Sequence, residues 1–217
     1  MARRTGDVIL DVRNLSLRFG GVKALTDITF DVREHEIRAI IGPNGAGKSS
    51  MLNCINGVYQ PQEGSISLRG RTFHQMNPRE VAQMGVARTF QNLALFKGMS
   101  VLDNIMTGRN LKMRTNLFQQ AVRLGAAERE ETAHRRVVEG IIDFLEIQPY
   151  RKSPVGKLAY GLQKRVDLGR ALAMEPEVLL LDEPMAGMNV EEKQDMSRFI
   201  LDVNDEFGTT IVLIEHD

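Results

Sequence analysis

The chain has 217 residues, with 28 Lys or Arg and 28 Asp or Glu, so its formal charge at neutral pH is zero. This length predicts one large domain or one domain with an insertion, and the balanced charge gives no reason to expect a nucleic acid or an anionic bilayer as partner. The single cysteine, Cys54, excludes an intrachain disulfide, the N-terminus lacks the apolar core of a signal peptide, and no apolar run approaches the roughly 18–20 residues that span a bilayer.

The N-terminal third alternates apolar and polar residues on both sides of Gly20-Gly21. The apolar positions are Leu15, Leu17 and Phe19 before the turn, and Ile28, Phe30 and Val32 after it. This period of two predicts an antiparallel hairpin, with Ser16 and Arg18 on a solvent-exposed face. Residues 64–70 predict a further short strand.

Residues 42–50 read GPNGAGKSS between an apolar strand, 37–41, and a helix that is expected to end near Gly57. This is the G-x-x-x-x-G-K-S pattern of a phosphate-binding loop in its required context. The glycines allow the backbone to wrap around phosphate oxygens, Lys48 can reach the β- and γ-phosphates, and the Ser49 hydroxyl can bind Mg²⁺. The alternative is a glycine-rich turn that only joins strand to helix. The expected nucleotide-binding residues here are Gly42, Pro43, Asn44, Gly45, Ala46, Gly47, Lys48, Ser49 and Ser50.

Residues 77–159 have a largely helical pattern, clearest over 128–147, where Val137, Val138, Ile141 and Leu145 form one apolar stripe. Segment 107–127 has the character of a helical insertion. Helix and apolar strand then alternate: helices over 162–174 and 190–206, and buried strands over 178–181 and 210–214. This order predicts an α/β core with mostly parallel strands.

Polar residues follow the last two of these strands. Asp182-Glu183 follows the first, and Glu215-His216-Asp217 follows the second. Because ligands bind at the carboxyl ends of parallel strands, Asp182 is placed to hold Mg²⁺ and Glu183 to polarise an attacking water as general base. The alternatives are a carboxylate pair that caps a helix and, for His216, an ordinary surface residue.

The segment LAYGLQ, 158–163, places a glycine just before a well-formed helix. Such a helix N-terminus can bind an anion, but one nucleotide site needs only one of them. Physical chemistry alone therefore favours an ordinary junction between loop and helix.

The chain resembles the nucleotide-binding subunit of an ABC transporter. GPNGAGKSS matches the Walker A motif, VLLLDE the Walker B motif, and LAYGLQ occupies the place of the signature. Gln91 in RTFQN matches the Q-loop, His216 in IEHD matches the switch histidine, and Phe19 sits where the family stacks an aromatic ring on adenine, although it could equally belong to the hairpin core.

The resemblance implies a P-loop NTPase (RecA-like) α/β fold with an N-terminal antiparallel β-subdomain and an inserted helical subdomain. The whole chain would be one ABC ATPase domain, with the β-subdomain and core at about 1–90 and 160–217 and the helical subdomain at about 91–159. Because the chain stops one residue after His216, it would lack a C-terminal part that relatives have.

The resemblance also implies roles and partners. Glu183, His216 and Gln91 would be catalytic, Ser49, Gln91 and Asp182 would hold Mg²⁺, and Phe19, Ala159, Tyr160 and Gly161 would contact ATP. The partners would be a second ATPase subunit, identical or not, transmembrane permease subunits and indirectly a solute-binding protein, with no nucleic acid. The chain would work peripherally at the cytoplasmic face of the inner membrane.

The finer resemblance is to ATPases that import branched-chain amino acids, carried by GMSVLDNIMTG, LAYGLQKR and DEPMAGMN; related groups serve urea, amides and lipopolysaccharide export. Ala159, Tyr160, Leu162 and Asn189 depart from the general family pattern, the first two and Asn189 with precedent in the amino acid group. Two rival functions remain: a non-transport ABC ATPase, and a module that binds ATP with weak or no hydrolysis.

Overall fold

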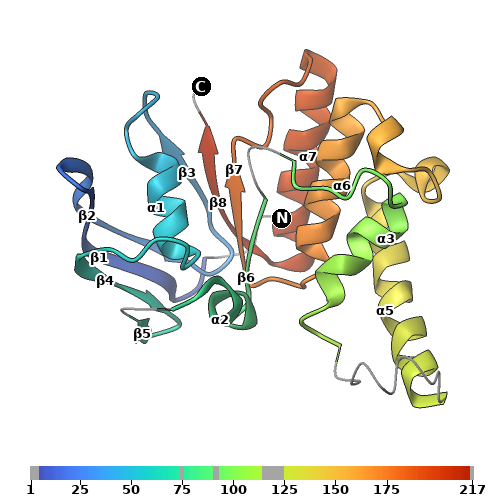
Figure 1. Ribbon diagram of the computed structural model, residues 1–217, viewed down its shortest axis with the longest axis horizontal. Coiled ribbons are helices and arrows are strands. Elements are labelled where there is room, and N and C mark those ends of the chain that lie inside the picture. Colours follow the sequence, from blue (N-terminus) through green and yellow to red (C-terminus); the bar gives the residue numbers. More distant parts are fainter. Residues whose placement is uncertain (1–4, 74–75, 90–92, 114–124, 216–217) are drawn as a thin grey trace. The chain divides into compact units, whose positions relative to one another are not determined.

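The computed structural model describes residues 5–73, 76–89, 93–113 and 125–215 (Figure 1). Contacts divide the chain into two compact units: Met1–Gln91 together with Glu177–Asp217, and Asn92–Pro176. We expected residues 160–176 to belong with the core, whereas their contacts place them in the second unit.

An antiparallel sheet forms the start of the first unit. Its strand order is β2-β1-β4-β5, with β1 at Val8–Phe19, β2 at Val22–Arg33, β4 at Glu63–Leu68 and β5 at Arg71–Phe73. Phe19 pairs with Val22 across the predicted turn, which confirms the hairpin. Ser16 is buried, contrary to expectation, because the strand register shifts beside it and its Oγ accepts a hydrogen bond from the Asp27 N–H at 3.1 Å.

A parallel sheet forms the rest of this unit, in the order β3-β8-β7-β6. Its strands are β3 (Ile37–Ile41), β6 (Val86–Arg88), β7 (Val178–Asp182) and β8 (Thr210–Glu215). Ile41 lies beside Glu215 and Asp182 beside Ile214, so three carboxyl ends meet at one edge, as predicted. The three-residue β6 was not predicted, since the sequence pattern there was interpreted as helical.

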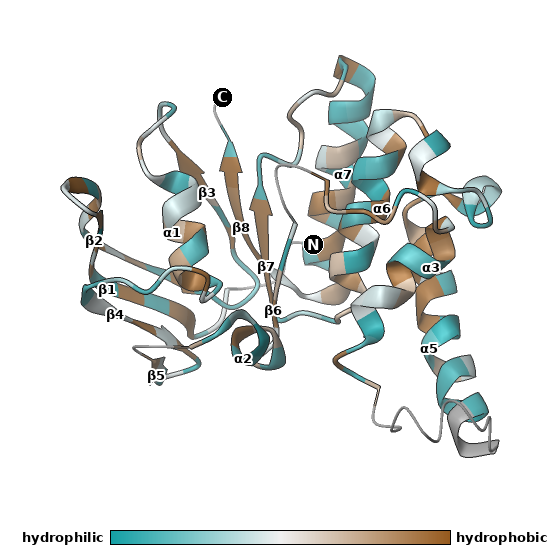
Figure 2. Ribbon diagram, in the orientation of Figure 1, coloured by the Kyte–Doolittle hydropathy of each residue, from teal (hydrophilic) through white to brown (hydrophobic). Residues whose placement is uncertain are grey.

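The core of the first unit connects the two sheets through α1, which spans Lys48–Ile55. Met51, Leu52, Cys54 and Ile55 are buried against apolar residues of both sheets. Figure 2 shows β7 and β8 as strongly hydrophobic, and the first four residues of β7 are fully buried. Burial raises the pKa of the Cys54 thiol to about 11, so this residue acts as a small core hydrophobe rather than a reactive thiol.

Two further helices of this unit are capped by their own sequence. The short α2 (Pro78–Gln83) and the long α7 (Val190–Phe207) both begin with a capping box, in which an asparagine and a glutamate bond each other's backbone N–H. At α7 the asparagine is Asn189, and the helix ends at Gly208, whose φ of 69° places it in the left-handed region.

The second unit is helical. It contains α3 (Val101–Met106), α5 (Gly125–Phe144) and α6 (Tyr160–Leu172), with short 3₁₀ turns η1 (Thr107–Arg109), η2 (Gln148–Tyr150) and η3 (Val155–Lys157). Val138, Ile141 and Leu145 are buried, which confirms most of the predicted apolar stripe on this segment.

Arg109 ties the helices of the second unit together. Its side chain is only 6 % exposed and pairs with Glu175 at 3.1 Å. Its Nε donates to His134 Nδ1 at 2.9 Å, and its Nη1 donates to the Ala173 carbonyl at 2.7 Å. Arg109 is therefore a structural arginine of this unit.

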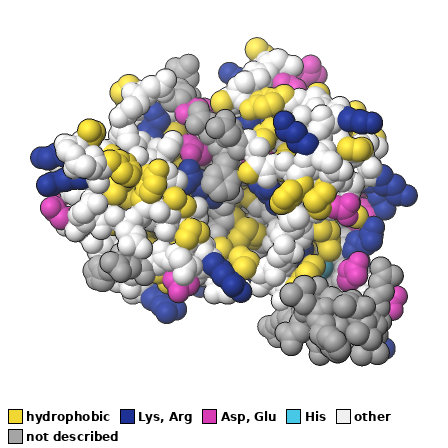
Figure 3. Space-filling model, viewed as in Figure 1, with side chains coloured by type: hydrophobic (Ala, Val, Ile, Leu, Met, Phe, Trp, Pro, Cys, Tyr) yellow, Lys and Arg dark blue, Asp and Glu magenta, His cyan; other side chains and the backbone are white. Residues whose placement is uncertain are grey.

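The surface has mixed charge. Figure 3 shows Lys and Arg side chains scattered among Asp and Glu side chains, without one continuous basic surface on the face in view. Within the described part of the chain, no helix combines the length and the apolar character that crossing a membrane requires.

Candidate functional site

The loop between β3 and α1 has the backbone of a phosphate cradle. Gly45 and Gly47 have φ angles of 82° and 84°, in the left-handed region that glycine adopts without strain. Gly47 is the N-cap of α1 and has no side chain with which to cap it. The first N–H groups of the helix, which have no partner within it, and the positive end of its dipole are thus suited to an anion.

Gly47 is required for packing as well as for its φ angle. A Cβ added there would overlap the carbonyl oxygen of Ala24 and come within 2.9 Å of Leu25 Cδ2. Ala24 and Leu25 belong to β2, so the loop lies directly against the hairpin. Gly45 differs, because a Cβ added there would meet open space.

Lys48 lies within the loop rather than in solvent. Its side chain reaches back, and Nζ donates to the carbonyl oxygens of Gly42 and, at 3.0 Å, of Pro43. The residue is 9 % exposed. These two carbonyls hold the ammonium group beside the backbone that would surround a phosphate.

Ser49 and Asp182 meet across the ends of α1 and β7. Ser49 Oγ donates to Asp182 Oδ1 at 3.2 Å, and Asp182 is 3 % exposed. A hydroxyl and a carboxylate are oxygen ligands of the type that Mg²⁺ prefers, and this ion needs few protein ligands when phosphates supply the others. The described ranges contain no group of three or more His, Cys, Asp or Glu residues arranged to hold a metal.

Glu183 occupies a turn immediately after β7. Its φ is 50°, its N–H donates to the Ile214 carbonyl at 3.1 Å, and its own carbonyl accepts from the Ala186 N–H at 3.2 Å. This turn places Glu183 at the wall of a cavity that the phosphate loop also lines, although the residue is only 8 % exposed. A carboxylate there can accept a proton from a water molecule.

A cavity of about 540 Å³ combines these features within the first unit. It extends from the end of the hairpin along the phosphate loop to Glu183. Its lining residues are Phe19, Val22, Lys23, Ala24, Asn44, Gly45, Ala46, Gly47, Lys48, Ser49, Ser50 and Glu183. Gly42 and Pro43 are not among these lining residues, but their carbonyl groups accept hydrogen bonds from Lys48.

Phe19 belongs to this cavity and not to the hairpin core. It is 47 % exposed, and its ring packs edge-on against Tyr59, with centroids 5.0 Å apart and an interplanar angle of 77°. Tyr59 fixes one side of the ring while the cavity stays open to another, a geometry that suits stacking on a flat base. Sequence reasoning missed Tyr59, since no motif marks it.

Arg88 was also missed. It comes from β6 and forms an ion pair with Asp182, with Nη2 and Oδ2 2.7 Å apart. Its other terminal nitrogen, Nη1, donates to Asn53 Oδ1 of α1 at 2.5 Å. The signal that could have found Arg88 is an arginine near the predicted Q-loop, but only the strand order β7-β6 places it beside Asp182.

Three other expected nucleotide-binding residues belong to the second unit. Ala159, Tyr160 and Gly161 lie at the start of α6 in the second unit, where Ala159 is the N-cap and has no side-chain cap bond. Tyr160 is 42 % exposed, and Lys164 Nζ lies 5.7 Å from its ring centroid. Gln91 and His216 lie outside the described residues.

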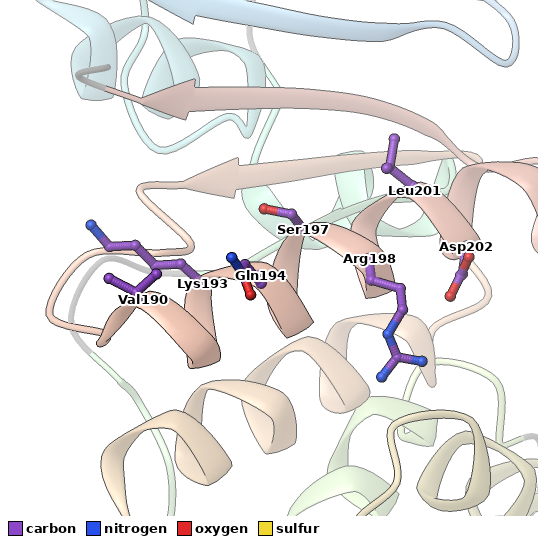
Figure 4. A pocket seen from close by; sticks show the side chains of 7 residues that line it. All are labelled: Val190, Lys193, Gln194, Ser197, Arg198, Leu201 and Asp202. Atoms are coloured by element: carbon purple, nitrogen blue, oxygen red, sulfur yellow. The ribbon is translucent and has the colours of Figure 1, made fainter.

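A second hollow, of about 490 Å³, lies along α7 (Figure 4). All of its lining residues come from that helix: Val190, Lys193, Gln194, Ser197, Arg198, Leu201 and Asp202. None of its lining residues is a glycine, and its charged lining residues are Lys193, Arg198 and Asp202. The first cavity is therefore the candidate nucleotide site.

Known proteins are similar to this chain over most of its length. Residues 25–186 match the family model described as ABC transporter. The high-affinity branched-chain amino acid transport ATP-binding protein LivG of Salmonella typhimurium is 36 % identical over 209 residues, which are 96 % of this chain and 82 % of LivG. The fructose import ATP-binding protein FrcA of Rhizobium meliloti is 37 % identical over 209 residues, or 96 % of this chain and 79 % of FrcA.

A solved structure is similar over the same span. It is a nucleotide-free ATP-binding cassette from an ABC transporter, with a TM-score of 0.83 and 30 % identity over 96 % of this chain and 81 % of that one. The expected fold class is confirmed.

Proposed function

Because the chain belongs to the ABC transporter family, as one of its ATP-hydrolysing cassettes, we propose that it powers the import of amino acids, branched-chain ones in particular. The observation that carries this proposal is the single cavity that combines the phosphate loop, Glu183 and the exposed ring of Phe19. Phe19 can stack on the nucleotide base, the loop can bind the triphosphate, and Glu183 can accept a proton from the attacking water.

Binding uses the two ends of the cavity. The face of Phe19 stacks on adenine, while the loop N–H groups and Lys48 hold the phosphates. Ser49 and Asp182, with Gln91, would hold Mg²⁺. When bound, that ion would supply positive charge against the negative charge that develops on the phosphate groups.

Hydrolysis needs a base near the γ-phosphate. Glu183 takes the proton of a water molecule whose oxygen attacks phosphorus, and the bond to the β-phosphate oxygen breaks to give ADP and phosphate. His216 would stabilise the γ-phosphate in the transition state. Lys48 balances charge on the leaving diphosphate.

A second cassette, identical or not, would complete the site. In this arrangement the α6 N-terminus of one chain, with Ala159, Tyr160 and Gly161, meets the γ-phosphate held by the loop of the other. Closure on ATP and opening after hydrolysis would drive a transmembrane permease, which receives solute from a binding protein. The chain would thus work at the cytoplasmic face of the inner membrane. The scattered surface charge in Figure 3 favours this over a nucleic-acid partner.

The amino acid assignment rests on the LivG similarity and on the motifs LAYGLQKR and DEPMAGMN. FrcA, at similar identity, carries a name with a different solute, so the identity of the cassette does not by itself assign the cargo. We infer that the permease decides the solute. Co-purified permease and cassette, reconstituted in vesicles, should hydrolyse ATP faster with leucine-loaded binding protein than with a fructose-loaded one. The reverse order would contradict the amino acid assignment.

The decisive test of the catalytic assignment is Glu183→Gln. The amide keeps the shape of the side chain and removes the proton acceptor, so hydrolysis should fall about 10²–10⁴-fold while ATP affinity persists. Single-turnover hydrolysis and titration with a fluorescent ATP analogue measure the two effects. Lys48→Ala is the matched comparison, because it should abolish binding instead. Hydrolysis near the wild-type rate in Glu183→Gln would exclude Glu183 as the base.

A further inference from the structure

Arg88 is a buried cation that the hydrolysis scheme leaves without a role. Its side chain is 5 % exposed, and that of its partner Asp182 is 3 % exposed. The two strands run parallel, with Arg88 beside Leu180 in the register, so the arginine at the end of β6 reaches the aspartate at the end of β7. Such burial removes both charges from water, and a pair of this kind needs well-defined geometry to be tolerated.

The two oxygens of Asp182 have different partners. Oδ2 lies 2.7 Å from Arg88 Nη2, and Oδ1 accepts from Ser49 Oγ at 3.2 Å. The guanidinium therefore occupies one oxygen and leaves the other directed at the hydroxyl. Because a small rotation of the carboxylate would weaken both contacts at once, Arg88 fixes the plane of the carboxylate, with one oxygen facing Ser49.

The other end of the guanidinium is anchored on the same helix as Ser49. Arg88 Nη1 donates to Asn53 Oδ1, and Asn53 lies one turn after Ser49 on α1, so both residues share a face of that helix. Asp182 is thus connected to α1 twice, directly through Ser49 and indirectly through Arg88 and Asn53. These four residues form a closed frame around the expected cation ligands.

We propose that Arg88 is a positioning residue for the divalent-cation site: it sets the orientation of Asp182 so that Oδ1 and Ser49 Oγ act together on the metal of a metal–nucleotide complex. This inference rests on the proposed Mg²⁺ site at Ser49 and Asp182. The planar fork of arginine suits the role, because it spans two acceptors in fixed geometry. Lysine would keep the charge and lose the fork.

The test measures how strongly a metal enhances nucleotide binding. A fluorescent ATP analogue is titrated in EDTA and again in excess Mn²⁺, and the ratio of the two dissociation constants is the readout. Loss of a residue that orients a metal ligand typically weakens metal affinity about 10–100-fold. Arg88→Gln should reduce the ratio by about tenfold or more, with the affinity in EDTA retained. Arg88→Lys and Asn53→Ala should each reduce it by a smaller factor.

Arg109→Gln is the matched control. Arg109 is an arginine of equal burial, 6 % exposed, whose contacts all lie within the second unit. The Arg109→Gln variant should have lower thermal stability, while its ratio of dissociation constants in EDTA and in Mn²⁺ should equal that of the wild type. Circular dichroism establishes the folded fraction of every variant, and if Arg88→Gln does not fold, Arg88→Lys and Asn53→Ala carry the test.

A double variant, Arg88→Gln with Asp182→Asn, shows whether Arg88 acts on metal binding through Asp182 or only stabilises the surrounding structure. Asp182→Asn alone should reduce the ratio, and adding Arg88→Gln should reduce it no further, because the oriented group is already gone. If Asp182→Asn leaves the ratio unchanged, the proposed metal site is wrong and the role of Arg88 fails with it. If Asp182→Asn reduces the ratio while folded Arg88 variants leave it unchanged, the site stands and the positioning role is overturned.

Discussion

Glu183 has a backbone conformation that a residue with a side chain rarely adopts. Its φ of 50° lies in the left-handed region, which costs a non-glycine residue of the order of 1–3 kcal/mol. The cost is tolerated because the bond from its N–H to Ile214 fastens the turn to the neighbouring strand. In return, the turn places the Glu183 carboxylate at the cavity wall immediately after the buried strand ends.

Phe19→Ala should weaken ATP binding by about 1–2 kcal/mol, or about 5–30-fold in dissociation constant, through lost stacking. The fold should persist, because Phe19 is half exposed and its ring makes a T-shaped contact with Tyr59. Nucleotide titration beside circular dichroism measures both. Val22→Ala, at the same cavity and 68 % exposed, is the control and should change affinity far less. If Phe19→Ala unfolds without a specific loss of affinity, Phe19 is a residue of the hairpin core and not a base-stacking residue.

Residues with a motif could be predicted, and residues that act through space could not. The phosphate loop was found because glycine, lysine and serine must occur at fixed spacing to surround a phosphate. Asp182 and Glu183 followed from the strand before them. Arg88 and Tyr59 escaped because their partners lie far away in sequence and no local pattern records an ion pair or a ring contact.

At the scale of elements, Asn189 illustrates how a departure from a family pattern can preserve a structure. Its Oδ1 accepts from the Glu192 N–H at 2.9 Å, and the Glu192 side chain accepts from the Asn189 N–H at 3.0 Å. Asparagine and aspartate are about equally good N-caps. The helix therefore begins at the same place with either residue.

Asn189→Ala should lower the free energy of unfolding by about 1 kcal/mol, because α7 loses its cap. Asn189→Asp should leave it nearly unchanged. Urea unfolding followed by circular dichroism measures both. Gln194→Ala, an exposed position within the same helix, is the control and should stay within about 0.5 kcal/mol of the wild type. Equal stability of Asn189→Ala and wild type would mean that packing alone holds the start of α7.

Elements with a clear local pattern were predicted well and those without one poorly. The helix that became α7 is long enough for its period to be visible, and the strand that became β7 is marked by a continuous apolar run. The strand β6 has only three residues and gains its identity from pairing with β7, which no local pattern records. Ser16 was misplaced for a related reason, since a register shift changes which face a side chain occupies.

At the scale of the whole molecule, a site shared by two chains would join the α6 N-terminus of one chain, which begins at Tyr160, to the phosphate loop of the other. If two copies of this chain share the site, specific ATPase activity should rise with protein concentration. Mixing Gly161→Asp and Lys48→Ala chains should then restore some activity that neither shows alone. The restored site combines the phosphate loop of the first variant with the α6 N-terminus of the second, while Gly161→Asp by itself repels the γ-phosphate.

A phosphate-release assay over a series of mixing ratios measures this recovery, and each variant incubated with an excess of itself is the control. No recovery, together with a wild-type rate independent of concentration, would rule out a shared site between copies of this chain. It would leave a different cassette as partner or a monomeric ATPase.

The contact between Gly47 and Ala24 has a consequence for which nucleotides fit. The hairpin carries the ring that meets the base, and the loop carries the groups that meet the phosphates. Because the bare Cα of Gly47 lies against the backbone of β2, the two contact points are held at one separation instead of moving independently. The hairpin and the loop together set a fixed distance between the base contact and the phosphate contacts. A ligand whose base-to-phosphate span is shorter than this distance can bind at the Phe19 ring or at the loop, but not at both.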